Sequence, residues 1–283
     1  MTIRVLPILA ENIPGVARFL HQHLNSRLPA QVWADSLAVP WPVRAPNHGF
    51  MLVVDALIVG VYLAFYCDRV IAGKTEQFCN LGGWCVLPEY RLQSVRLLKA
   101  LLAQDGYHFT DLSPSGNVIP INRRFDFQFL DSDLVAVPNL PWPSPRGRIT
   151  SDPRRLDRLL TGSDHDIYRD HRQTLAAHHV LIESRGESCY VIFRRDRPKN
   201  LPLFASLVHV SNPEVFRRRF RPFTSHLLTR HGIPATLVEP RVAGFHPRAA
   251  LPVHTARRRM FRSDTLQPHQ IDYLYSELVC VPF

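Results

Sequence analysis

The sequence predicts an α/β protein built from two halves, each with strands, a helix that begins at a polar turn, and a further strand. This order of elements occurs first over residues 75–112 and again over residues 203–239. Between them, residues 136–153 contain five Pro and few large apolar side chains, which is typical of a boundary. A chain of 283 residues is also long enough for two domains of about 150 residues each. We therefore predict domains at 1–135 and 154–283, joined by a Pro-rich linker and related by a diverged duplication.

Hydrophobic periodicity places the elements of the first half. Strands are predicted at 3–9, 49–54, 57–67, 75–86, 108–112 and 125–130, and helices at 11–24, 31–37, 91–104 and 118–124. The helix at 91–104 has the clearest apolar stripe, and Asp105-Gly106 ends it. The longest apolar run, residues 50–66, carries Asp55 at its middle and is rich in Val, Ile and aromatic residues. We predict two strands turning at Asp55-Ala56 there, and not a membrane span.

The second half opens with a polar helical region at 157–177. Strands are predicted at 189–194, 203–210 and 235–239, a helix at 213–231, and a closing strand at 271–283. Ser211 followed by Glu214 is typical of a capping box at the start of the long helix. In the closing strand, alternation would put Tyr273, Tyr275 and Glu277 on one face. That face either lines a cleft or belongs to a half-buried edge of the sheet.

The charge of the chain is uneven. There are 34 basic and 24 acidic residues, a net charge of +10, and residues 151–283 contribute +8 of it. Such an excess favours an anionic partner, for example a phosphorylated cofactor, an acidic surface or a nucleic acid. The Arg runs at 217–219 and 257–259 lie beside Phe residues, a combination that single-stranded nucleic acids bind. Three successive helical residues cannot form one stripe, so the run at 217–219 argues against a nucleic-acid interface. We expect a solvated face, with a phosphate or anionic-substrate site as the first alternative and nucleic acid as the second.

Motifs for metal binding and for hydrolysis are missing from the sequence. The five Cys and 14 His form no zinc-ligand spacing, and there is no Gly-x-Ser-x-Gly segment. We therefore expect reduced core cysteines, no metal site and no serine hydrolase. The first residues also lack the layout of a signal peptide, so we expect a cytoplasmic protein without a membrane partner.

The segment 85–96 carries a family resemblance. Val86, Pro88 and Arg91 fit a Val-x-Pro-x-x-Arg pattern that ends a strand and opens a helix. On this segment and the order of elements, roughly residues 1–133 resemble the GNAT superfamily of acyl-CoA-dependent N-acyltransferases. The resemblance implies that each half contains a mixed central sheet flanked by helices. It also implies acyl transfer from acetyl-CoA or another acyl-CoA to an amine of a small molecule or a sugar.

By this resemblance, the turn after the strand holds the pyrophosphate of CoA at the start of a helix. Its backbone N–H groups have no partner within the helix, and the helix dipole adds positive charge. The candidate cofactor-binding residues are Val86, Leu87, Arg91, Leu92, Gln93, Ser94, Val95, Arg96 and Asn117. Ser94 and Arg96 stand where the family has small residues, usually Gly. Arg96 must therefore point away or bind a phosphate itself.

Two residues are candidates for the chemistry of transfer. The family often uses a carboxylate on this strand as general base, and Glu76 is the only acidic residue at 75–86. The alternative is that Glu76 is a surface carboxylate near the strand start. Asn122 stands where the family often has the Tyr that protonates the leaving thiolate, and Asn cannot act as an acid. Two main functions remain possible: an N-acyltransferase, and a non-catalytic GNAT-like protein that binds a ligand or partner. RNA binding by the basic second half is a third, less favoured alternative.

Overall fold

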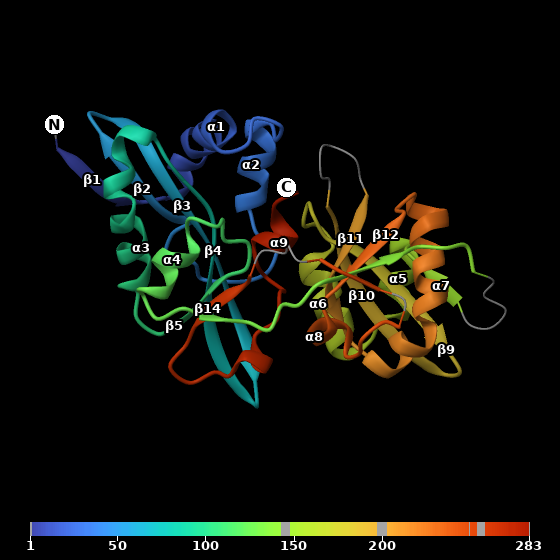
Figure 1. The fold of residues 1–283 in the computed structure, drawn as a ribbon. Helices are drawn as coiled ribbons and strands as arrows, with labels where there is room; N and C mark the ends of the chain where they lie inside the picture. The colour runs from blue at the N-terminus through green and yellow to red at the C-terminus, as the bar shows by residue number, and fades with distance from the viewer. Residues whose placement is uncertain (1, 143–147, 197–202, 249, 254–257, 283) are drawn as a thin grey trace. The chain divides into compact units, whose positions relative to one another are not determined.

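The computed structural model contains two compact units, shown in Figure 1. The structure describes residues 2–142, 148–196, 203–248, 250–253 and 258–282. Unit 1 comprises Met1–Leu130, Arg257–Ile271 and Tyr275–Val281, and unit 2 comprises Asp131–Ala256, Asp272–Leu274 and Pro282–Phe283. Residues 143–147 of the predicted linker, and Arg257 of the second Arg run, lie outside the described residues.

Unit 1 contains a mixed sheet of seven strands in the order β1-β2-β3-β4-β5-β14-β6 (Figure 1). The strands are β1 (Ile3–Pro7), β2 (Gly49–Val54), β3 (Leu57–Ile71), β4 (Lys74–Val86), β5 (Tyr107–Asp111), β14 (Met260–Arg262) and β6 (Gln128–Phe129). The helices are α1 (Ile13–His23), α2 (Ala30–Leu37), α3 (Val95–Leu102), α4 (Ile119–Arg123) and the short α9 (Glu277–Cys280). Three 3-10 turns accompany them: η1 (Ala10–Asn12), η2 (Pro88–Gln93) and η4 (Pro268–Gln270). The elements predicted for residues 1–130 are all present, although β6 is shorter than predicted and η2 occupies the start of the predicted helix at 91–104.

Both faces of this sheet are buried, which explains the long apolar run in the sequence. The run forms β2 and β3, and it turns at Asp55 and Ala56, which both have positive φ. Tyr62 and Tyr66 point to the face that is covered by α3. Leu63 and Phe65 point to the opposite face and are equally buried. Because α1 packs against β3 and β4, the sheet lies between helices, as an α/β architecture requires.

Unit 2 contains a second sheet of seven strands, in the order β13-β7-β12-β11-β10-β9-β8. The strands are β7 (Val135–Pro138), β8 (Arg148–Thr150), β9 (His178–Ser184), β10 (Glu187–Asp196), β11 (Phe204–Val210), β12 (Ala235–Val238) and β13 (Leu251–Pro252). The helices are α5 (Pro153–Leu159), α6 (Gly162–His171), α7 (Pro213–His231) and α8 (Pro240–Ala243). The predicted helical region at 157–177 is therefore two helices, and β9 lies in a stretch to which the sequence assigned no element.

The two sheets have the same succession of strands. Four antiparallel strands (β1 to β4, and β8 to β11) are followed by a helix and a parallel fifth strand (β5, and β12). An antiparallel sixth strand then pairs with the fifth, and a short seventh strand pairs with the sixth. This shared topology supports the predicted duplication, for which the sequence shows no residue-level repeat.

The sixth strands come from unexpected parts of the chain. In unit 1 the sixth strand is β14, from the C-terminal region, and in unit 2 it is β7, from the start of the predicted linker. As a result, two segments of the predicted second domain, 257–271 and 275–281, belong to unit 1. The predicted linker at 136–153 contains most of β7 and all of β8. A physical reason is that the fifth strand of each sheet would otherwise leave an unpaired edge.

The predicted closing strand at 271–283 is absent, and the prediction was wrong. The described part of this segment contains a helical turn, α9, whose N-cap Ser276 accepts a hydrogen bond from the backbone N–H of Leu278. Tyr275, just before the cap, has a φ of 59°, which ends any extended run. The alternation of aromatic and polar residues was local, whereas the turn is fixed by contacts with distant strands.

The start of α7 also differs from the sequence interpretation. Asn212, and not Ser211, is the N-cap, and its side chain accepts a hydrogen bond from the backbone N–H of Val215. Ser211 instead donates to Asp164 over 2.8 Å and accepts from the backbone N–H of Tyr190. At its other end, α7 stops at Gly232 in the left-handed conformation, as predicted.

No helix within the described residues has both the length and the apolar character needed to cross a bilayer.

Candidate active site

Strands β4 and β5 separate at one end of the unit 1 sheet. Their parallel pairing runs from Gln77 opposite Tyr107 to Leu81 opposite Asp111, which is the last residue of β5. Strand β4 continues to Val86 and stays paired only with β3. A register shift accompanies the separation, and Gly83 there has a φ of 62°. The backbone of residues 82–86 is therefore turned away from the regular ladder on the β5 side, which leaves polar groups for a ligand.

The turn after β4 leads into α3. Residues of η2 form the turn, and Ser94 at the N-cap of α3 makes no side-chain capping bond. The first turn of α3 contains no acidic residue, and Arg91 in the turn before it is exposed. An uncapped helix start with a nearby guanidinium attracts an anion. The geometry of this turn thus fits a phosphate group.

Arg96, the bulky substitute for a small residue, contacts both this turn and β1. One guanidinium nitrogen donates to the carbonyl of Ile3 over 3.2 Å, and the other donates to the side chain of Gln93 over 3.4 Å. The side chain is thereby directed toward β1.

The other cofactor candidates differ in exposure. Val86 and Leu87 pack against the core below α3, and the backbone N–H of Leu87 donates to Val59. Leu92 is 96% exposed. The structure places Gln93, Ser94 and Val95 half-buried along the turn, and Asn117 exposed before α4.

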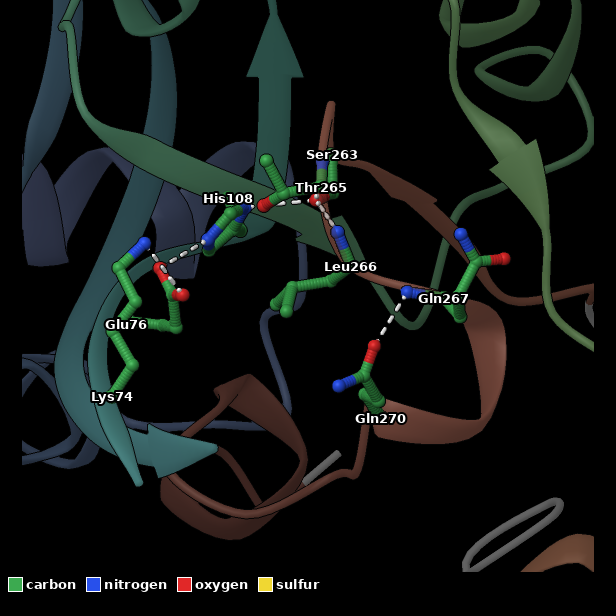
Figure 2. A network of polar contacts seen from close by, with 8 residues as sticks. All are labelled: Lys74, Glu76, His108, Ser263, Thr265, Leu266, Gln267 and Gln270. Carbon is green, nitrogen blue, oxygen red and sulfur yellow. Dashed lines mark hydrogen bonds and ion pairs between the residues drawn. The ribbon is translucent and has the colours of Figure 1, made fainter. Parts of the chain in front are cut away.

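Glu76, the predicted general base, lies at the opposite end of β4. Figure 2 shows it between Lys74 and His108, whose Nε2 is 3.0 Å from its carboxylate. Hydrogen bonds from His108 and Lys74 hold the pKa of Glu76 below its ordinary value. Gly82 lies six positions further along the strand than Glu76, about 20 Å away at ~3.3 Å per residue. Glu76 is therefore not brought together with the helix start.

The same network includes a serine, but its arrangement is structural. Ser263 is 2.9 Å from Nδ1 of His108, so Ser263, His108 and Glu76 form a chain that resembles a hydrolase triad (Figure 2). The hydroxyl oxygen of Ser263 accepts hydrogen bonds from the backbone N–H groups of Thr265 and Leu266. Because both lone pairs are used, this oxygen is no nucleophile, and the network fixes the segment after β14 to the sheet.

Asn122, the second catalytic candidate, lies at the separated strands. It is fully buried, and its Nδ2 donates to a carboxylate oxygen of Asp111 over 2.8 Å. Tyr62 donates to the same oxygen over 3.2 Å. Burial raises the pKa of Asp111 to about 6, although these two donors and the backbone N–H of Ser113 lower it. Asn122 therefore holds a carboxylate in place, and it carries no acidic proton of its own.

A second carboxylate reaches this place from the C-terminal segment. Glu277 of α9 is fully buried and packs so closely on Gly82 that a Cβ at that glycine would lie 2.9 Å from the Cβ of Glu277. Ser113 donates to Oε1 of Glu277 over 2.8 Å. Burial, and then the charge of Asp111, raise the pKa of Glu277 to about 7.

Two acceptors in this cluster have no hydrogen-bond partner among the described residues: Oε2 of Glu277 and Oδ1 of Asn122. A buried acceptor without a donor is costly, and such groups in native proteins call for an explanation. Here both lie where the two parallel strands separate. They are suited to receive N–H donors from a bound molecule.

Asn80 fixes the segment that carries Glu277. Its Nδ2 donates to the carbonyl of Tyr275 over 3.0 Å and to that of Phe65 over 3.1 Å, and its Oδ1 accepts from Thr110. Trp41 adds an edge-to-face contact with the ring of Tyr275. Asn80 therefore ties β3, β5 and the C-terminal segment together.

Replacing Asn80 by Leu is expected to release this segment. The carbonyl of Tyr275 and the hydroxyl of Thr110 lose their partners, which costs about 1–3 kcal/mol of unfolding free energy for each buried group. Hydrogen exchange at the amides of residues 278–281 should accelerate in Asn80→Leu. Asn117→Leu, at an exposed site, is the control. Unchanged exchange in Asn80→Leu would show that Asn80 does not hold the segment.

Three residues of this cluster escaped the sequence interpretation: Asp111, Tyr62 and Ser113. Asp111 and Ser113 flank the end of a predicted strand, a position where parallel sheets commonly bind ligands, and that signal could have identified them. Tyr62 lies inside an apolar run, and its role depends on the pairing of strands. Glu277 was noted from the sequence, but on a predicted strand that does not exist.

The helix of unit 2 that corresponds to α3 is closed to an anion. Asn212 caps α7, and Glu214 adds negative charge to its first turn. Gly244 packs so tightly on Pro213 that a Cβ there would lie 2.4 Å from the Cβ of Pro213. Of the two equivalent helix starts, that of α3 is thus the one suited to a phosphate. Within the described residues, no three His, Cys, Asp or Glu side chains gather as metal ligands do.

Comparison with known proteins identifies the fold. The sequence matches no protein-family model, and no curated protein matches it. Solved structures match over most of the chain. A GCN5-related N-acetyltransferase from Anabaena variabilis has a TM-score of 0.59 at 12% identity, over 92% of this chain and 72% of the other. A putative acetyltransferase from Pyrococcus horikoshii has a TM-score of 0.56 at 12% identity, over 97% and 93%.

The N-myristoyltransferase of Saccharomyces cerevisiae, solved with bound myristoyl-CoA, is also similar. Its TM-score is 0.52 at 9% identity, over 99% of this chain and 86% of the other. These proteins differ in the acyl group that their names record but share one arrangement of strands and helices. Together with the separated β4 and β5 and the helix start beside them, the matches show that this chain has the fold of the GNAT superfamily.

Proposed function

We propose that this protein is an acyl-CoA-dependent N-acyltransferase whose site lies in unit 1. The observation that carries the proposal is the meeting of three features at one end of the sheet. The backbone of β4 leaves its partner strand, an uncapped helix start follows at once, and the buried carboxylate of Glu277 packs against Gly82. The similarity of the fold to acetyl- and myristoyltransferases supports the same activity.

The residues at this end fit the parts of an acyl-CoA. The start of α3 and Arg91 offer N–H donors and positive charge to a diphosphate. The backbone of residues 82–86 offers donors to a thioester carbonyl, whose oxygen gains negative charge during transfer. Exposed Leu92 provides apolar surface beside the turn. We place the acyl-CoA along this line, from the turn to the separated strands.

Glu277 suits the proton transfer that an amine requires. An amine attacks a thioester through its lone pair and must lose a proton as the C–N bond forms. A base works best when its pKa lies near the working pH, and burial brings the pKa of Glu277 to about 7. The charge of the second carboxylate, Asp111, helps to raise the pKa of Glu277. We propose an amine of a small molecule or of a sugar as the acceptor.

One alternative is supported by a specific observation. Glu277 and Asn122 are both fully buried, and the side chain of Glu277 occupies the space beside Gly82. A closed cluster of this kind also suits a GNAT-like protein that binds CoA or another ligand without turnover. The two functions share the anion site at α3, and they differ in whether Glu277 is reached by substrate.

Binding of acetyl-CoA tests the site. At about 100 times Kd, a ligand that binds only the folded state adds about 2.7 kcal/mol to the free energy of unfolding, which raises Tm by roughly 5 °C. We expect Arg91→Glu to abolish this shift, because it reverses a charge beside the diphosphate. Arg158→Glu, the same charge change on α5, should leave the shift intact. An equal shift in both variants would contradict the placement of the site.

Release of free thiol separates the alternatives. Acetyl-CoA and longer acyl-CoAs are incubated with a panel of primary amines, including amino sugars. Thiol release above the rate without protein supports the transferase. A thermal shift without thiol release over the whole panel supports the binding protein.

A further inference from the structure

The residue at the expected acid position has no proton to give. In the resemblance noted from the sequence, a Tyr near the end of the fourth helix protonates the leaving thiolate. Here that position is Asn122, whose amide donates to Asp111 and whose remaining acceptor has no partner among the described residues. If the protein transfers acyl groups, a thiolate formed at the separated strands must be protonated by another group.

The other hydroxyls of the cluster are poor donors to a thiolate. Burial, together with the charge of Asp111, raises the pKa of Tyr62 well above its ordinary value, so this phenol keeps its proton. Its hydrogen bond is directed at Asp111. Ser113 is engaged with Oε1 of Glu277. Within this cluster, the carboxyl groups are therefore the ones that exchange protons near neutrality.

The two carboxyl groups have unequal surroundings. Asp111 receives hydrogen bonds from Asn122, from Tyr62 and from the backbone N–H of Ser113, all of which favour its charged form. Glu277 accepts from Ser113 on one oxygen, and its Oε2 has no partner among the described residues. Its own backbone N–H and the charge of Arg259 also favour its charged form, but burial and the charge of Asp111 outweigh them. A proton shared by this coupled pair is therefore held on Glu277, at Oε2.

We propose that Glu277 performs both proton transfers of the reaction: its Oε2 accepts the proton of the attacking amine and then gives it to the departing sulfur. The inference rests on the proposed function and deepens it. One C–N bond forms, one C–S bond breaks, and one proton passes from nitrogen to Glu277 to sulfur, so the reaction balances without a further acid. Asp111 is a positioning residue, because its charge keeps the proton on its neighbour.

The pH profile of the wild-type protein tests this inference directly. With acetyl-CoA and the fastest amine of the panel, log kcat/KM should rise with pH to a plateau as Glu277 loses its proton. Ionisation of the amine only adds to this rise. The charged or titratable groups that face Glu277 are Asp111 on β5, Tyr62 on β3, Arg259 before β14 and Cys280 on α9. None of them must start protonated as an acid in this scheme, so no falling limb is expected up to pH 9.5.

A second test varies the leaving group. The probes are two acetyl thioesters without a nucleotide, S-acetyl-N-acetylcysteamine and S-phenyl thioacetate. An aryl thiolate leaves without a proton, whereas an alkyl thiolate needs one. Glu277→Gln should therefore lower kcat/KM at least tenfold more for the alkyl than for the aryl thioester. Because the pH profile uses the wild type, the inference stays testable even if this variant does not fold.

The results of these two tests distinguish failure of the inference from failure of the proposed function. A falling alkaline limb in the wild type, or an equal loss with both thioesters, would mean that another group protonates sulfur and would overturn the inference while leaving the transferase intact. No thiol release by the wild type with any acyl-CoA or thioester would overturn the proposed function, and this inference with it.

Discussion

Glu277→Gln is expected to lower kcat for amine acylation by about 10²- to 10⁴-fold, the usual contribution of a positioned general base. The amide has nearly the same shape, so its oxygen still accepts the hydrogen bond from Ser113 and its methylene groups still pack on Gly82. What it loses is the ability to take a proton. The thermal shift with acetyl-CoA should therefore persist while turnover falls, and the comparison of the two measurements isolates the chemical step.

Glu76→Gln is the matched control, because it makes the same change on the carboxylate that the sequence favoured. Glu76 contacts Lys74 and His108, at the far end of β4 from the helix start. We expect kcat within about twofold of the wild type. A loss of turnover in Glu76→Gln with normal turnover in Glu277→Gln would return the base to Glu76 and remove Glu277 from the chemistry.

The sequence predicted those parts of the fold that local pattern determines. The apolar run at 50–66 could only become two buried strands around Asp55, and the stripe of α3 marks one helix face. The turn between β4 and α3 could also be predicted, because a Pro that lies between a strand and the start of a helix is a local feature. These signals lie within a few residues of one another, so they can be recognised without knowing which other elements pack against them.

The residues of the candidate site could not be predicted from local sequence pattern. Glu277 reaches β4 because Asn80 holds the carbonyl of Tyr275, a contact between residues 195 positions apart. Nothing near Glu277 in the sequence records that contact, and the local alternation of Tyr273 and Tyr275 favoured a strand. Asp111 is likewise an ordinary strand end until Asn122 and Tyr62 are placed on it.

Some short strands could not be predicted from the sequence for a related reason. Strand β14 has three residues, too few for periodicity to register, yet it forms the sixth strand of the unit 1 sheet. It pairs with the edge of β5 that would otherwise be unpaired, and the sequence does not show which strand has such an edge. Strand β9 was missed because its apolar centre, Val180 to Ile182, lies between polar ends and directly follows a helical region.

The two units are expected to respond to pH in opposite directions. In unit 1, burial raises the pKa of Asp111 to about 6 and that of Glu277 to about 7. The folded state thus binds more protons than the unfolded chain between about pH 4 and pH 7, and its free energy of unfolding falls as pH rises through that window. Each unit of pKa shift corresponds to about 1.4 kcal/mol, so the ionisation of each carboxyl lowers the free energy of unfolding by about 3 kcal/mol across this window. His48, whose pKa burial lowers, opposes this trend in unit 1.

In unit 2, buried histidines make the free energy of unfolding fall as pH falls. Burial lowers the pKa of His171 to about 4, of His179 to about 3 and of His226 to about 4. Here the unfolded chain binds more protons, so stability is complete above about pH 6.5 and is lost as pH falls toward 4. Acid should therefore open unit 2 first, and alkali should weaken unit 1.

The hydrogen bonds around His226 give the acid effect a structural cause. A guanidinium only donates, so Arg195, 3.2 Å from Nδ1 of His231, leaves the proton of that ring on Nε2. His231 then donates to Ser151 over 3.0 Å, which leaves the hydroxyl proton of Ser151 able to be donated to Nε2 of neutral His226 over 2.9 Å. Protonation of His226 turns the acceptor of the Ser151 hydroxyl proton into a donor and places a positive charge beside Arg230, so the Ser151 hydroxyl must reorient and this link between α7 and the residue after β8 is weakened.

Hydrogen exchange measured separately in β3–β4 and in β9–β11 checks the prediction. Between pH 8 and pH 4.5, after correction for intrinsic rates, protection should fall in unit 2 and rise in unit 1. His226→Gln keeps an acceptor for Ser151 without a titrating group and should reduce the acid sensitivity of unit 2 alone, whereas Glu277→Gln should flatten the response of unit 1 alone. Parallel changes in both units would contradict the assignment, because groups with pKa shifts of opposite sign cannot destabilise both units over the same pH range.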